Sequence, residues 1–152
     1  MSYATIEAAV QTLLQALDNF ASADVTRGDW RVLDSGGAPY AVLYPGPFAA
    51  AVGGDWGQHV IDWTVNCEVF ERYLDNGTSE TSLEATRQAV IDALLSYPTL
   101  NGVSGVTLVL PERAEPIQYV YDESGGGPFF VMQRISILVV ERTCADGSGE
   151  FA

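Results

Sequence analysis

The residues of this chain that could carry out chemistry are few, and they do not form recognised motifs. His59 is the single imidazole among 152 residues, and Cys67 and Cys144 are the two thiols. Gly102–Gly105 includes Ser104, but it departs from a nucleophile elbow because Val106 stands where the last glycine belongs. One histidine and no paired-cysteine spacing also argue against a metal centre.

The glycine-rich segments do not predict a cofactor either. Gly125–Gly127 is followed by Pro128, and Phe130 replaces the third glycine of a dinucleotide fingerprint, so no helix can begin there. Twenty acidic residues always place some pair of carboxylates close together, which carries little information. We therefore expect no enzyme and no cofactor. The alternative that stays open is a small-molecule-binding domain or enzyme with an apolar pocket under the segment Pro45–Trp56.

The charge balance argues against nucleic acid as a partner, and the proline content argues against a membrane. The basic residues are seven arginines against twenty acids, for a net charge of −13, so the chain repels phosphate and is not expected to grip nucleic acid. Ser35–Gly54 is uncharged and as long as a membrane span. Its three prolines rule out a continuous helix, so we expect no contact with a membrane. Met1–Thr5 has no cationic start, so we expect no export signal and two reduced cysteines.

Two helices are predicted from apolar residues at the 3.6-residue spacing. The first begins near Ser2 or Thr5 and carries Ile6, Val10, Leu13, Leu14, Leu17 and Phe20. The second begins at Thr78, Ser79 or Thr81, stops before Pro98, and carries Leu83, Val90, Ile91, Leu94 and Leu95.

Strands are predicted at residues 30–34, 40–44, 58–73, 103–110, 116–122 and 129–143. Residues 45–57 are predicted to be a connection without regular structure, because prolines and glycines interrupt it. The order α-β-β-β-α-β-β-β indicates an α+β fold, with two helices packed on a mostly antiparallel sheet. We expect one domain over residues 1–143 and a flexible C-terminal tail over 144–152.

The length of the two longest strands raises a geometric problem. A compact chain of this size has a diameter of about 38 Å, whereas about fifteen extended residues reach about 50 Å. Either the strands bend at a bulge or their ends project, and we predict that Tyr40–Tyr73 projects as a long hairpin or loop. The alternative is that the loop folds back over its own core. A projecting apolar loop needs a partner, and the candidate interface residues are Tyr44, Pro47, Phe48, Val52, Asp55 and Trp56.

The whole pattern resembles the tail terminator family of long-tailed bacteriophages, also called tail-completion or minor tail U proteins. The resemblance spans Ile6 to about Glu141, and it consists of similar residue types at similar spacings rather than of one diagnostic motif. The segments that carry it are Trp30–Leu33, Ala41–Gly46, Trp63–Phe70, Arg87–Leu94, Glu115–Pro116 and Gln133–Glu141.

The resemblance implies a structural virion protein without catalytic residues. Such a protein forms a hexameric ring with copies of itself, caps the tail tube, and presents a surface to the head-closure or connector protein. Its place is the head–tail junction of the virion, and the host cytoplasm during assembly. DNA passes through the ring without specific binding, and we expect Asp and Glu to line the channel. A head-closure, neck or other tail-joining protein is the alternative.

Overall fold

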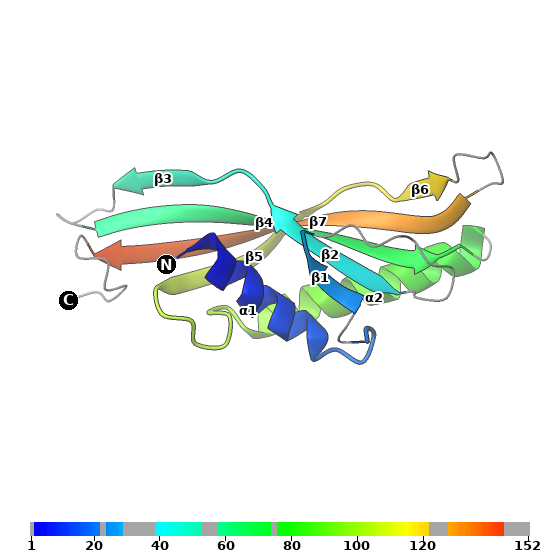
Figure 1. Ribbon diagram of the computed structural model, residues 1–152, viewed down its shortest axis with the longest axis horizontal. Helices are drawn as coiled ribbons and strands as arrows, with labels where there is room; N and C mark the ends of the chain where they lie inside the picture. Colours follow the sequence, from blue (N-terminus) through cyan, green and yellow to red (C-terminus); the bar gives the residue numbers. More distant parts are fainter. Residues whose placement is uncertain are drawn as a thin grey trace.

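The computed structural model describes residues 2–21, 24–28, 39–52, 58–73, 76–121 and 128–144. The elements follow in the order α1 (Tyr3–Gln15), β1 (Val25–Arg27), β2 (Tyr40–Pro45), β3 (Ala49–Val52), β4 (Gln58–Arg72), α2 (Asn76–Ser96), β5 (Val106–Ala114), β6 (Gln118–Tyr121) and β7 (Pro128–Cys144) (Figure 1). They form a seven-stranded sheet covered by two helices, and β1 and β2 are its parallel pair. The predicted α+β class with a mostly antiparallel sheet is confirmed.

The centre of the sheet is the antiparallel pair of β4 and β7. These strands have 15 and 17 residues and pair from Gln58 with Cys144 to Arg72 with Phe130, with no shift of register. A strand of this length extends about 50 Å, which is longer than a compact globule of the same mass. The pair therefore has no bulge that would bend it. The end beside β3 runs beyond α1, whereas α2 reaches as far as the opposite end (Figure 1). Of the described residues of Tyr40–Tyr73, only β3 and the start of β4 project, so the predicted projection of the whole segment is wrong for β2, whose residues Tyr40–Leu43 are buried.

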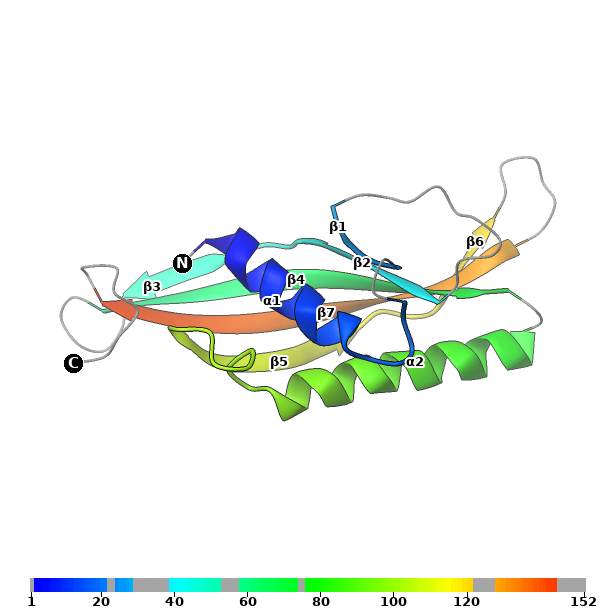
Figure 2. The ribbon, with the colours of Figure 1, turned by 60° about the horizontal axis from the view of Figure 1, so that its bottom comes forward.

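Both helices lie on one face of the sheet and share its main core (Figure 2). Ser2 caps α1, since its hydroxyl accepts the backbone N–H of Thr5 at 3.4 Å. The apolar side of α1 supplies Ile6, Val10 and Leu14, and α2 supplies Leu83, Val90 and Leu94, all fully buried. Cys67 is buried in the same layer of β4, as the alternating pattern predicts.

The opposite face of the sheet carries no helix among the described residues, but it has a smaller aromatic cluster. Tyr40 stacks on Phe70 with ring centroids 4.7 Å apart, and it meets Phe130 edge-on at 5.9 Å. Val42 and Met132 complete the buried part of this cluster. We call this side the helix-free face.

The structure corrects the prediction that residues 45–57 lack regular structure. Ala49–Val52 forms β3 and pairs with His59–Asp62 of β4. Gly46 allows the chain to stay close to β4 on the way there: its N–H donates to the carbonyl of Thr64 at 2.9 Å, and a Cβ at this position would lie 2.8 Å from Thr64 Cγ2. The sequence also gives no hint of β1.

Two other expectations lie outside the described residues. These are the whole of the predicted strand at 30–34 and residues 145–152 of the predicted tail.

Candidate assembly surface

The candidate interface residues divide into those the structure places and those it does not describe. Tyr44, Pro47 and Phe48 lie in or just after β2, on the path that leads to β3. Val52 ends β3, where its backbone pairs with His59. Asp55 and Trp56 lie outside the described residues. The assembly role of all six remains a prediction.

Phe48 and Pro47 are the exposed candidates among those whose side chains the structure describes. The Phe48 side chain is 65% exposed, and its ring lies 5.6 Å from that of Trp63, centroid to centroid. Trp63 is itself held from the other side by Tyr3 of α1, at 6.0 Å. The aromatic ring of Phe48 is thus supported by the sheet on one side and open to a partner on the other.

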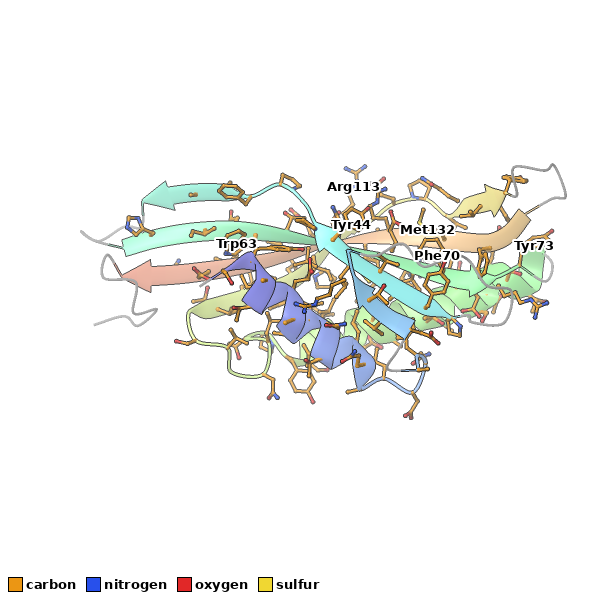
Figure 3. All side chains as sticks on the ribbon, viewed as in Figure 1. Tyr44, Trp63, Phe70, Tyr73, Arg113 and Met132 are labelled. Atoms are coloured by element: carbon orange, nitrogen blue, oxygen red, sulfur yellow. The ribbon has the colours of Figure 1, made fainter. Side chains whose placement is uncertain are left out.

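Tyr44 has a different environment, because its hydroxyl is engaged within the chain. It donates to Glu68 Oε1 at 2.7 Å, and Arg134 Nη2 donates to the same oxygen at 3.1 Å. The guanidinium also lies 5.8 Å above the Tyr44 ring. Burial, followed by the hydrogen bond to Glu68, raises the pKa of Tyr44 to about 12. Tyr44 therefore orders the helix-free face at the middle of the sheet (Figure 3).

Pro47 borders a shallow open groove of about 390 Å³ on the helix-free face. The other lining residues are Thr64, Asn66, Glu112, Arg113, Glu115 and Ser136. Arg113 and Glu115 form an ion pair at 3.2 Å across it. These polar side chains differ from the apolar pocket that the small-molecule alternative expects under this segment.

Charge is distributed unevenly between the two faces. Arg72, Arg134 and Arg142 lie at alternate positions that share the helix-free face, beside Asp62 and Glu68. The charged residues of the helices and of the strands under them are mainly acids, among them Glu7, Glu71, Glu80, Glu84, Asp92 and Glu141. Acidic lining of a channel would therefore need the helix side or residues outside the described ranges.

Two exposed leucines were not among the candidates. Leu108 and Leu110 of β5 are 41% and 39% exposed and lie on the helix-free face, opposite Val140 and Leu138 of β7. The sequence predicts a strand at 103–110 without marking either leucine as an interface residue. Both leucines stay exposed because no described helix covers the helix-free face, and their local pattern does not show which face the helices cover.

The described part of the chain contains no group of three or more His, Cys, Asp and Glu side chains that could hold a metal ion. His59 is exposed at the start of β4. Among the described residues, no helix is both long and apolar enough to cross a bilayer.

No protein-family model and no curated protein matches this sequence. Among solved structures, a chain of one titled "Virion of native gene transfer agent (GTA) particle" matches with a TM-score of 0.55. The alignment covers 93% of this chain and 98% of that chain, at 19% sequence identity. The two chains therefore share a fold over nearly their whole lengths.

Proposed function

We propose that this chain is a structural protein of a tailed, phage-like virion. The observation that carries the proposal is the fold that it shares, almost end to end, with a chain of a virion particle. The distribution of its residues fits such a role: apolar side chains at the projecting end of the sheet, Phe48 above all, remain exposed. Such side chains are normally covered by partners in an assembly.

Within the virion, we propose the role of a tail terminator. A ring of identical copies, hexameric by the family resemblance, would cap the tail tube and join it to the head connector. A ring needs a contact between two different surfaces of the same chain, with a rotation that closes. The projecting end of the sheet offers two such surfaces, the strands β3 and β5 at its opposite edges. No bond-making centre is needed for this role.

The test of this role is tube length. Purified chain is added to its own tail-tube protein during polymerisation, and the tubes are measured by electron microscopy. We expect tubes that stop growing and carry a ring at one end. Tubes that grow unchanged, with no added density at either end, would contradict the terminator role.

A head-closure or neck protein is the second candidate function, because the same fold suits that role as well. The helix-free groove beside Pro47, with its polar lining, is compatible with a neighbour on either side. Cross-linking in intact particles separates the two roles: a terminator is linked to the tube protein, whereas a head-closure protein is linked to the portal side alone.

A further inference from the structure

The projecting end of the sheet has two outer strands. At this end the described strands lie in the order β3-β4-β7-β5, because β3 pairs with β4 and β5 pairs with β7. Figure 1 shows β3 and β5 on opposite sides of the β4–β7 pair. Each outer strand has a row of backbone groups that faces away from its neighbour in the sheet.

Neither outer strand carries a charge where the sheet projects. β3 is Ala-Ala-Ala-Val, and the first part of β5, Val106–Leu110, is Val-Thr-Leu-Val-Leu. Proteins usually protect such edges with charged residues, proline or bulges. β5 has Pro111 and two shifts of register, one between Val106 and Leu108 and one between Pro111 and Arg113. Leu108–Leu110 between them pairs regularly with β7, and the pairing of β3 with β4 has no shift.

The registers of the three strand pairings place residues of β3 and β5 in the same row across the sheet. Ala49 lies opposite Asp62, Asp62 opposite Val140, and Val140 opposite Leu108. Directly opposite residues of antiparallel strands share a face, so this row places a small side chain at one edge and a large one at the other. Ala49 is exposed, and Leu108 is 41% exposed.

The strand directions also match. Each of the three pairings from β3 to β5 is antiparallel, so β3 and β5 run in opposite directions. When a second copy is placed beside the first in the same orientation, its β3 therefore runs antiparallel to β5 of the first. Antiparallel pairing is the more stable arrangement of two strands.

We propose that β3 of one copy pairs with Leu108–Leu110 of the next copy, so that Leu108 and Leu110 pack over the alanines of β3. The partner is a second copy because the two edges are of similar length, uncharged, opposite in direction and at the same end of one chain. Copies of net charge −13 repel one another, so a contact free of charge is where they can meet closely. This inference rests on the proposed function in that it names the contact from which the ring is built.

Disulfide cross-linking tests the pairing directly. Ala49→Cys and Leu108→Cys are made in separate full-length chains with Cys144→Ser, and Leu110→Cys covers a stagger of two residues. Paired strands bring Cα atoms to about 5 Å, within reach of a disulfide. Burial raises the pKa of the native Cys67 thiol to about 12, so this thiol does not compete.

We expect a covalent dimer when the two single-cysteine chains are mixed and oxidised, and none from either chain alone. A chain with both cysteines should give a ladder on a denaturing gel, whose highest rung counts the copies in a closed ring. A dimer from Ala49→Cys alone would indicate a two-fold β3–β3 contact and would overturn the proposal.

A charge placed at the edge gives a second test. Ala49→Lys should convert the assembly to monomer in light scattering, while its circular dichroism stays that of the folded chain. The matched control is Gln118→Lys, an exposed position in β6, which should leave the assembly intact.

The outcomes separate this contact from the function itself. An assembly that caps tubes but gives no cross-link and tolerates Ala49→Lys overturns the contact and leaves the terminator role standing. A chain that stays monomeric at millimolar concentration and does not cap tubes overturns both.

Discussion

Arg134 lies directly opposite Glu68 across the β4–β7 pair and donates to its Oε1 from Nη2 at 3.1 Å and from Nε at 3.3 Å. The Glu68 side chain is 2% exposed, whereas that of Arg134 is 44% exposed. Glu68 Oε2 has no hydrogen-bond partner within the described residues. The buried carboxylate is thus held by the half-exposed Arg134, which balances its charge, and by the hydroxyl of Tyr44, which donates to the same oxygen at 2.7 Å.

Arg134→Ala should therefore destabilise the chain by about 3 kcal/mol, because it removes the counter-charge of a buried carboxylate and leaves it the hydrogen bond from Tyr44. Denaturant unfolding measures this change. Arg113→Ala is the matched control: the Arg113 side chain is 71% exposed in its ion pair with Glu115, and its loss should cost under about 0.5 kcal/mol. Equal effects of the two variants would contradict this account.

Glu141→Gln should stabilise the chain at neutral pH. Glu141 is 1% exposed on the helix side, and burial raises its pKa, an effect that the nearby Trp63 side chain partly offsets. An acid whose pKa is raised on folding binds more protons in the folded state, so its cost to stability is full at neutral pH. The cost falls as pH drops through the raised pKa and is gone below the unfolded value of about 4.5.

The measurement is urea unfolding of the native chain and of Glu141→Gln at a series of pH values from 7 to about 4. The gain from the substitution should be greatest at pH 7 and shrink toward the acid end. Glu84→Gln, at an exposed position of α2, serves as the control and should show no such trend. A gain that grows as pH falls would mean that the sign is wrong.

Phe48→Asp should remove assembly without unfolding the chain. The ring is 65% exposed, so its loss costs the contact with Trp63 and little else, about 1 kcal/mol or less. Light scattering reports the assembly, and thermal unfolding reports the fold. Leu94→Asp is the contrasting variant, since Leu94 is fully buried and an unpaired charge there should unfold the domain. Loss of folded protein with Phe48→Asp would show that this residue belongs to the core.

Gly46→Val should destabilise the projecting end by about 1–3 kcal/mol, because its side chain would overlap Thr64 and Asn66, which lie 2.8 and 3.0 Å from the position of a Cβ. Thermal unfolding measures the loss. Ala49→Val, three residues later at an exposed position, should change stability by no more than about 0.5 kcal/mol. A neutral Gly46→Val would mean that the chain between β2 and β3 moves away from β4 at no cost.

The helices and the two long strands could be predicted because their apolar periods are long and uninterrupted. β3 could not, because alanine has little preference for strands and Pro47 precedes it. Its pairing with β4 is a tertiary contact that the composition of Ala49–Val52 does not indicate. β1 has three residues, too few for a period to be recognised.

The candidate surface was predicted in part. The exposure of Phe48 could be predicted because the strands beside this uncharged segment are longer than a compact domain of this size. Leu108 and Leu110 were missed because the outer position of β5 depends on the order of the strands, which no local pattern contains. Tyr44 was chosen for its place in an apolar segment, whereas its partner Glu68 is 24 residues away and faces it only once β2 and β4 pair.

The unbroken register of β4 and β7 has a mechanical consequence. With no bulge to act as a hinge, the β4–β7 pair forms one rigid two-stranded unit from His59 to Arg72 of β4. A displacement or rotation imposed at the end beside β3 is transmitted along these two strands to their opposite end, where β6 pairs with β7. Two neighbouring proteins, one bound at each end of the β4–β7 pair, would therefore be mechanically coupled through a single chain.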